Sequence, residues 1–235
     1  MRNAALCSLI LLALPLAAAA KSPVARPPVV VELYTAQGCA SCGDANAYLA
    51  KLADRPGVLA LTLPVDYWDY LGWADTFAKP EFAERQKAYV SRLALREPYT
   101  PQVVVDGRAQ AGGLQTAKVE QLLAEAARHP RKTLALAFVG AARVDVGTGV
   151  PPRGGAEVWM IRYDPRAQEV AVKTGDNKGQ TMVHRNVVRE IKRLGAWRGR
   201  ARAYRLPPAA EDGLATAVLV QAAPGGRVLG VAQKD

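Results

Sequence analysis

The stretch VVVELYTAQGCASC, residues 29–42, decides the fold of this 235-residue chain. It opens with Val29–Thr35, a short and mostly apolar run rich in β-branched side chains, which predicts a buried strand. Cys39 and Cys42 follow in a short turn, and Asp44–Ala53 then has the spacing of a helix with one apolar face. We therefore expect both sulfurs at the N-terminus of a helix, where a thiolate is stabilised.

The segments that follow extend this unit. Val58–Val65 is a second apolar run of strand length, so the two strands and the helix between them predict a parallel βαβ unit. Pro80–Arg96 and Thr116–Ala127 have the composition and end signals of helices. Between them, Thr100–Ala111 has the pattern of two short strands around an Asp-Gly turn. The order β-α-β-α-β-β-α predicts an α/β domain over residues 29–130.

The pattern changes after Lys132. Short strand candidates, most of them separated by turns rich in Gly and Pro, predict a mainly antiparallel, sandwich-like β domain over residues 131–235. The candidates are Thr133–Val146, Ala156–Tyr163, Glu169–Lys173, Ala201–Leu206, Ala215–Gln221 and Arg227–Ala232. Val183–Leu194 is ambiguous, because its apolar residues recur at helical spacing, and a helix that interrupts the sheet is one interpretation.

Residues 1–20 predict a secretory signal peptide. Arg2 gives a positive start, residues 4–16 are apolar, and small residues lead to a cleavage site near Ala20. A membrane anchor is the weaker alternative, because the apolar run is shorter than the roughly 18 residues of a membrane helix. Residues 21–28 form a lead-in segment. We expect a secreted or periplasmic protein, in a compartment that permits disulfides.

Charge is distributed unevenly along the chain. Lys21–Pro130 carries 12 basic and 12 acidic residues, whereas Arg131–Asp235 carries 18 basic and 9 acidic ones, so the net charge of +10 belongs almost entirely to the second half. A basic surface favours an acidic protein or an anionic membrane as partner. Nucleic acid is disfavoured because the protein is predicted to be exported. A solvated basic face without a dedicated ligand is the alternative.

Four blocks of the sequence occur in the order expected for a known family. They are ELYTAQGCASC (32–42), VDYWDYLGW (65–73), Arg85-Gln86 and Tyr99–Gln102. Together they resemble a bacterial family of secreted thioredoxin-like proteins of unknown function. The resemblance is strong over Val29–Gly113 and loose over Asn177–Trp197. It implies a thioredoxin-like fold in which the bond between Thr100 and Pro101 is cis and lies beside the cysteine pair.

The chain departs from this pattern at two positions. Pro64 stands where the family is expected to have a histidine, so any role of that imidazole is absent. Gly38 stands where thioredoxin itself has an aromatic residue before its cysteines, which alters the surface that a substrate would meet.

The hypothesis for function is thiol–disulfide exchange with protein or small-molecule thiols and disulfides. Cys39 would be the exposed nucleophile, with a pKa lowered by the helix N-terminus. Cys42, one turn into the helix and more buried, would resolve the mixed disulfide. Thr100 and Pro101 would lie beside the pair. This chemistry needs no cofactor.

Two alternatives use the same cysteines without catalysis. One is a binding module in which a static disulfide clips the first turn of the helix. The other is a copper(I) site made of two thiolates. The chain has only two histidines, His129 and His184, and a closed zinc site needs four nitrogen or sulfur ligands, so we predict no metal site from these residues.

Gly38, Asp66, Trp68 and Asp69 are candidates for a substrate-facing rim. The two carboxylates bracket Trp68 after the second strand, at the sheet edge where α/β proteins bind ligands. Asp66 could also relay a proton to Cys42. Alternatively, the aspartates cap the loop through Asx turns while the aromatic residues pack as core. Arg85 or Gln86, on the helix predicted to follow, could pair with Asp66 or Asp69.

Overall fold

The computed structural model describes residues 26–129, 131 and 134–234. The predicted signal peptide and the lead-in residues up to 25 lie outside these ranges. Within them, none of the helices has the length and apolarity that crossing a membrane requires.

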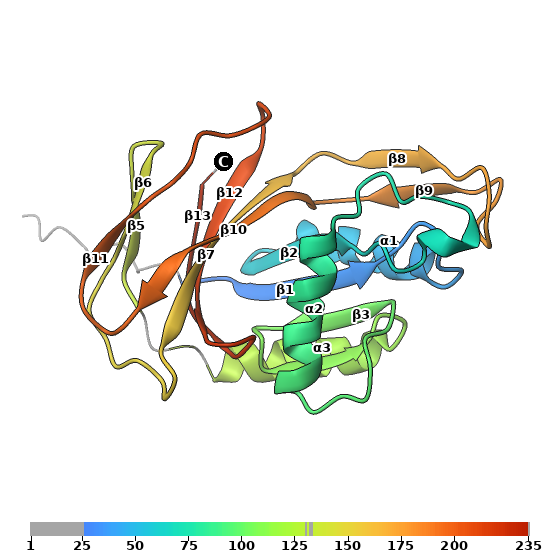
Figure 1. The fold of residues 1–235 in the computed structure, drawn as a ribbon. Coiled ribbons are helices and arrows are strands. Elements are labelled where there is room, and N and C mark those ends of the chain that lie inside the picture. Colours follow the sequence, from blue (N-terminus) through green and yellow to red (C-terminus); the bar gives the residue numbers. More distant parts are fainter. Residues whose placement is uncertain (1–25, 130, 132–133, 235) are drawn as a thin grey trace, which may run out of the picture.

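One eight-stranded sheet runs through both halves of the chain (Figure 1). Its strands are β1 (Val29–Thr35), β2 (Val58–Pro64), β3 (Gln102–Val105), β4 (Ala109–Gly112), β7 (Ala156–Asp164), β10 (Val187–Trp197), β12 (Ala215–Ala222) and β13 (Val228–Lys234). Their order across the sheet is β13-β12-β7-β10-β2-β1-β3-β4. β1 and β2 are parallel, which confirms the predicted βαβ unit. β10 also runs parallel to β2, so the predicted boundary near residue 130 separates strands of one mixed sheet.

Three helices cover the first half of this sheet. They are α1 (Cys42–Ala53), α2 (Pro80–Arg92) and α3 (Thr116–Arg128), and a short 3-10 helix, η1 (Asp69–Leu71), precedes α2. Val31 and Leu33 of β1 share one apolar cluster with residues of α1 and α3. Val30 and Tyr34 point to the other face and share a cluster with residues of α2. Alternation along β1 therefore buries both faces, as its continuous apolar sequence indicates.

A three-stranded sheet packs against the second half of the large sheet. It consists of β5 (Leu136–Val139), β6 (Arg143–Val146) and β11 (Arg202–Arg205), in the order β11-β6-β5. Trp197, Met160 and Val144 belong to the apolar cluster between the two sheets. The predicted sandwich-like arrangement of the second half is thus present, although one of its layers continues into the first half.

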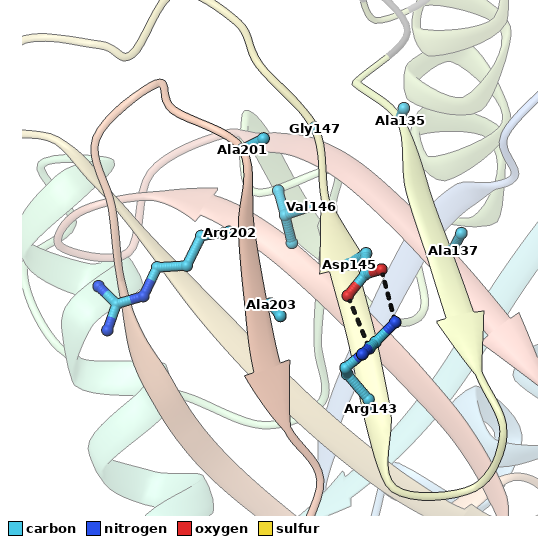
Figure 2. A pocket seen from close by; sticks show the side chains of 9 residues that line it. All are labelled: Ala135, Ala137, Arg143, Asp145, Val146, Gly147, Ala201, Arg202 and Ala203. Carbon is cyan, nitrogen blue, oxygen red and sulfur yellow. Dashed lines mark hydrogen bonds and ion pairs between the residues drawn. The ribbon is translucent and has the colours of Figure 1, made fainter.

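The outer face of the small sheet carries a shallow groove of about 460 Å³ (Figure 2). Alanines and Gly147 form much of its lining, and Arg143 and Asp145 pair along β6, with Nε of Arg143 3.1 Å from Oδ1 of Asp145. Arg202 points away from that pair. The groove gathers no set of groups suited to nucleophilic or acid–base chemistry, so it is not the candidate active site.

The remaining hairpin, β8 (Gln168–Ala171) and β9 (Thr181–His184), forms a sheet of its own. It extends from the second half towards α1, and β9 contacts that helix (Figure 1). This hairpin is the part of the second half that reaches the cysteine region.

The helical interpretation of Val183–Leu194 is wrong, because the segment forms the end of β9 and most of β10. The pairing of β10 with β7 shifts register between Val188 and Glu190 and again between Arg193 and Gly195. Each such bulge adds a residue, so side chains on one face recur three positions apart there instead of two. Two bulges in one strand therefore imitate helical spacing.

Two other predicted boundaries also differ from the structure. Thr133–Val146 is not one strand, because a turn at residues 140–142 divides its described part into β5 and β6. α2 ends at Arg92 rather than Arg96, since Ala94 adopts a positive φ of 52° and the Leu95 amide donates back to the Val90 carbonyl. This hydrogen bond closes the helix in a Schellman motif.

Candidate functional site

Cys39 and Cys42 form a disulfide where β1 passes into α1. The turn between them is closed by backbone hydrogen bonds, from the Cys39 amide to the Ala36 carbonyl (3.2 Å) and from the Cys42 amide to the Cys39 carbonyl (3.0 Å). Cys42 is the first residue of α1, so the pair lies at the helix N-terminus as predicted.

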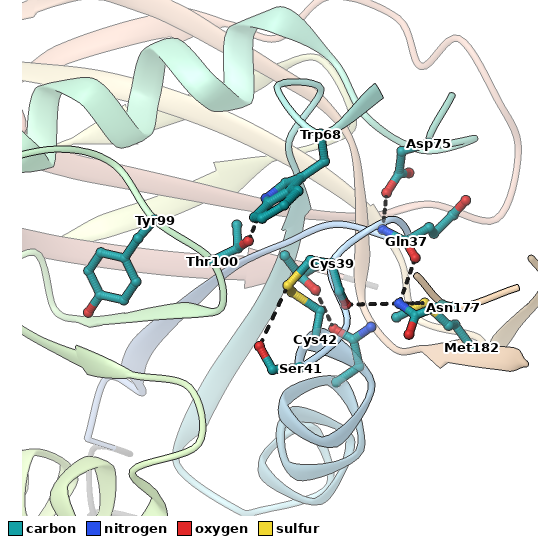
Figure 3. The surroundings of a disulfide bond; sticks show 12 residues. Gln37, Cys39, Ser41, Cys42, Trp68, Asp75, Tyr99, Thr100, Asn177 and Met182 are labelled. Carbon is teal, nitrogen blue, oxygen red and sulfur yellow. Dashed lines mark hydrogen bonds between the residues drawn. A yellow bond between two sulfur atoms is a disulfide. The ribbon is translucent and has the colours of Figure 1, made fainter. Parts of the chain in front are cut away.

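Both cysteines are buried in this disulfide form. Cys39 is 2% exposed and Cys42 is fully buried, and both belong to the apolar cluster on the α2 face of the sheet. The expectation that Cys39 is exposed is therefore wrong for this form. The burial arises because the turn lies between neighbouring segments, which include Trp68 and Asn177 (Figure 3).

Thr100, which precedes Pro101, lies beside the disulfide (Figure 3). The peptide bond between them is cis. Gly113 separates Pro101 from α1, and a Cβ at this glycine would lie 2.8 Å from Cβ of Pro101 and 2.9 Å from Cβ of Ala45. This close approach needs glycine. Figure 3 shows Thr100 next to the two sulfurs.

Trp68 joins this group from the loop after β2. Its indole Nε1–H donates to Oγ1 of Thr100 at 2.7 Å. A Cβ at Gly38 would lie 3.7 Å from Cβ of Trp68, so the tryptophan packs against that glycine. The structure therefore brings Gly38 and Trp68 to the site together with the cysteines and Thr100.

The two rim aspartates are arranged differently. Asp69 accepts a hydrogen bond from the Asp75 amide (Oδ1–N 3.0 Å), which is the loop-capping role. Asp66 is half-buried, and its backbone carbonyl accepts from the Asp69 amide at 3.0 Å. The Asp69 contact supports the loop-capping alternative for that residue, although it spans six positions and is not an Asx turn, and the role of the Asp66 side chain stays a prediction.

The suggested pairing of Arg85 or Gln86 with these aspartates is wrong. Arg85 donates through Nη2 to Oε1 of Glu32 at 2.6 Å, and both side chains are buried. Gln86 donates to the Tyr99 carbonyl (2.8 Å) and accepts from the Tyr67 hydroxyl (3.1 Å). Arg85 pairs with Glu32 of β1 because α2 lies across that strand.

Sequence reasoning missed three residues that hold the cysteine loop: Gln37, Asp75 and Asn177. Asp75 accepts from the Gln37 amide through Oδ2 at 2.7 Å. Burial raises the pKa of Asp75, and the backbone hydrogen bonds that it accepts oppose that shift. Asn177 donates through Nδ2 to the carbonyls of Gln37 and Cys39, both at 2.8 Å. The only sequence signal for Asn177 is its position at the start of the loosely resembling segment.

The Gln37 side chain extends this network to the loop before α2. Its Oε1 accepts from Nε1 of Trp73 at 2.8 Å, and its Nε2 donates to Oγ1 of Thr76 at 2.9 Å. Gln37 is fully buried, and its backbone and side-chain polar groups are paired. The turn before Cys39 is therefore fixed from two sides, by residues 73–76 and by the β8–β9 hairpin.

His184 is the last residue of β9, and it faces α1. Its Nδ1 is 3.2 Å from Nδ2 of Asn46, whose Oδ1 accepts from the Thr35 hydroxyl at 2.9 Å. The ring is fully buried and packs edge-on against Phe77, with centroids 5.6 Å apart. Burial lowers the pKa of His184 to about 4, so the imidazole is neutral at pH 7.

The histidines do not complete a metal centre with the cysteines. Among the residues that the structure describes, no three or more His, Cys, Asp or Glu side chains are grouped so that they could hold a metal ion. His129 is exposed at the end of α3.

Comparisons with known proteins agree with the fold and leave the function open. The family model described as "Protein of unknown function (DUF1223)" matches residues 30–221. The crystal structure of protein AGR_C_4864 from Agrobacterium tumefaciens is 30% identical, with a TM-score of 0.73, over 88% of this chain and 94% of that one. HBP35 of Porphyromonas gingivalis, at 12% identity and a TM-score of 0.56 over 91% and 76%, is similar in fold alone. A search of curated proteins found no match.

Proposed function

The chain belongs to the DUF1223 family of proteins of unknown function, and from its site we propose that it is an exported thiol–disulfide oxidoreductase. One observation carries this proposal: the Cys39–Cys42 disulfide opens α1 at the end of β1, next to the cis Thr100–Pro101 bond. A thioredoxin-like site has this combination of elements. The parallel β1-α1-β2 unit and the β3–β4 hairpin supply its frame.

The reaction is a two-electron exchange between this pair and a substrate. In the direction of substrate reduction, the Cys39 thiolate attacks a substrate disulfide and forms a mixed disulfide, which releases one substrate thiolate. The Cys42 thiolate then attacks the Cys39 sulfur, which releases the second substrate thiolate and leaves the Cys39–Cys42 disulfide. The substrate disulfide gains two electrons and the pair loses two. The helix N-terminus stabilises the Cys39 thiolate in this cycle.

Burial of the pair sets a condition on the reaction. An attacking thiolate must reach a sulfur, yet Cys39 is only 2% exposed. Exchange from the oxidised form therefore requires a local opening of the groups around the turn. Native proteins undergo local openings of this kind.

The predicted signal peptide and the basic second half suggest where this activity takes place and which partners it involves. We place the enzyme in the periplasm or outside the cell, where disulfide exchange occurs. Exposed arginines gather at β11 and the turn before it, at Arg198, Arg200, Arg202 and Arg205. Their charge suits an acidic partner protein or an anionic membrane surface, which would bring the site to its substrates.

The direct test is an insulin-reduction assay with dithiothreitol. The wild-type mature protein should accelerate insulin precipitation, and the Cys39→Ser variant should reduce the rate to that without enzyme. Ala40→Ser is the matched control, because it changes an exposed residue of the same turn without removing a sulfur. Equal activity of wild type and Cys39→Ser would sink the oxidoreductase proposal.

A second candidate follows from the same burial. Two cysteines that are 2% and 0% exposed also suit a binding module, with a static disulfide or, when reduced, a two-thiolate copper(I) site. The reduction potential of the pair separates these functions, because structural disulfides in secreted proteins typically lie below about −300 mV. A competition titration of the reduced protein with a copper(I) chelator tests the metal alternative, which fails if no copper is bound.

A further inference from the structure

Asn177 connects the second half of the chain to the cysteine turn through the backbone. Its Nδ2 donates to the carbonyls of Gln37 and Cys39, the two residues that flank Gly38, at 2.8 Å each. The side chain is 1% exposed, and Sδ of Met182 lies 3.5 Å from the same nitrogen. Figure 3 shows Asn177 on the side of the turn where the Cys39 carbonyl points. One amide group therefore fixes the spacing of two carbonyls across the residue that precedes the disulfide.

The tip that presents Asn177, residues 172–180, is held to the first half by separate local contacts. Among the described residues, β8 and β9 pair only with each other, and an isolated two-stranded hairpin is marginally stable by itself. Besides Asn177, the tip is held by Thr174, whose hydroxyl donates to the Gly72 carbonyl at 2.6 Å. At the base of β9, His184 contacts Asn46, and Arg185 pairs with Asp54 at 2.7 Å. Val172 and Met182 of the hairpin are also buried in the apolar cluster that contains both cysteines, so apolar packing and these polar contacts together hold the tip on the turn.

These contacts are made in the disulfide form. Reduction removes the S–S bond, and the two sulfurs must move apart to van der Waals distance. Cys39 is one of the two residues that must adjust, and its own carbonyl is one of the two acceptors of Asn177. In the disulfide form both hydrogen bonds of Asn177 are already short. A change in the turn after reduction can therefore weaken these bonds but can hardly strengthen them. The contact therefore favours the disulfide over the dithiol.

We infer that Asn177 is a positioning residue that couples the β8–β9 hairpin to the redox state of Cys39 and Cys42. The hairpin closed on the turn stabilises the disulfide, and by linkage the disulfide stabilises the closed hairpin. This inference deepens the proposed function, because it names a device that adjusts the potential of the same pair. The second half of the chain thereby contributes a residue to a site whose cysteines come from the first half.

The first test measures the redox equilibrium of the pair in glutathione buffers, using the mature full-length protein. Asn177→Asp keeps the shape, but its ionised carboxylate only accepts hydrogen bonds, so the donor to the two carbonyls is lost. We expect the equilibrium constant for the disulfide to fall about fivefold, the size of one net hydrogen bond. That corresponds to a potential about 20 mV more positive.

Asn186→Asp is the matched control. Asn186 is a buried asparagine of the second half that donates through Nδ2 to the Ala60 carbonyl at 2.8 Å, in β2 rather than at the cysteine turn. This variant should lose similar stability and keep the wild-type potential. If Asn177→Asp keeps the wild-type potential, or if both variants shift it equally, the inference is overturned.

The second test needs no variant. Amide hydrogen exchange is compared between the oxidised protein and the protein reduced with a phosphine. The amides of Gly179 and Gln180, which bond within the tip to Val172 and Asn177, should exchange about fivefold faster after reduction, by the same linkage. The β5–β6 hairpin is the internal reference. Unchanged exchange of the tip would refute the coupling.

The two tests separate this inference from the proposed function. A shifted potential and faster tip exchange, together with an inactive insulin assay, would remove the oxidoreductase proposal and keep the coupling. Activity that depends on Cys39, with no shift and no change in exchange, would keep the enzyme and remove the role of Asn177.

Discussion

The buried cluster under α2 and the cluster around the cysteine turn both join the two halves of the chain, but they use different interactions. Under α2, Arg85 bonds Glu32 through Nε (3.0 Å) and Nη2 (2.6 Å) and donates to the Tyr89 hydroxyl (3.1 Å). Gln221 of β12 donates to the same hydroxyl at 2.9 Å, and the Arg85 guanidinium lies 5.6 Å from the ring of Trp159 on β7. Burial raises the pKa of Tyr89, so the hydroxyl stays protonated.

The cysteine turn is held instead by single hydrogen bonds to backbone groups. Asp75 accepts from the Gln37 amide, and Asn177 donates to two carbonyls. A bond of this kind has a net value of about 1 kcal/mol. Removing one partner of a buried ion pair costs about 3–5 kcal/mol, because the other charge is left unpaired. The difference indicates that losing one contact of the first cluster costs more stability than losing one hydrogen bond at the cysteine turn.

Arg85→Ala should produce the largest effect on this comparison. It leaves the Glu32 carboxylate buried without its cation, so we expect a loss of about 3–5 kcal/mol in the free energy of unfolding, measured in guanidinium chloride. Arg55→Ala is the control. It breaks an exposed ion pair with Glu120 and should cost about 0–1 kcal/mol. Equal costs for the two variants would contradict the structural role of the α2 cluster.

The elements that local sequence rules predicted are those whose signals are local. β1, α1, β2 and the Asp-Gly hairpin follow from apolar period, turn residues and helix ends within a few positions, and the structure confirms them. β10 was ambiguous because two bulges break its alternation. Its pairing with β2 joins residues more than a hundred positions apart, through Val187 and Thr62, and no local pattern encodes such a contact.

The candidate site divides in the same way. The cysteine pair is a local motif, and Pro101 came from the resemblance. Asn177 could not be found from its surroundings, because GDNKG at residues 175–179 has the composition of an ordinary turn. Its role depends on where the hairpin packs. The burial of Cys39 was missed for the same reason, since segments distant in sequence cover it.

The pH dependence of stability should reveal the contribution of His184, which packs against α1 near the cysteine turn. The pKa of His184 is lowered by burial to about 4, below the value of about 6.5 expected in the unfolded chain. The neutral His184 ring therefore makes its whole contribution to the free energy of unfolding above pH 6.5, and this contribution is lost as the pH falls towards 4. The loss from this group approaches about 3 kcal/mol at the low end.

His184→Gln removes this titration, so its stability should fall less than that of the wild type between pH 6.5 and 4. The measurement is guanidinium unfolding at several pH values, and the difference between the two proteins isolates the histidine from other groups. His129→Gln, an exposed position, is the control and should follow the wild type. Parallel curves for wild type and His184→Gln would show that the ring is not buried as neutral imidazole.

The smallest expected effect concerns Trp68 and its bond to Thr100. Trp68→Phe keeps an aromatic ring against Gly38 but loses the indole donor, so stability should fall by about 1 kcal/mol. Because this bond lies beside the sulfurs, a phosphine should also reduce the disulfide of the variant faster than that of the wild type. Trp73→Phe is the matched control, since Trp73 donates to Gln37 through the same indole group.

The comparison between the two tryptophans separates access from stability. Both variants lose one hydrogen bond from an indole, so their unfolding free energies should change alike. If only Trp68→Phe accelerates reduction, the Trp68–Thr100 bond controls entry to the sulfurs, while Trp73 fixes the backbone that precedes them. Equal acceleration by both would mean that any loosening of the turn exposes the disulfide, and the role of Trp68 as a specific cover would be lost.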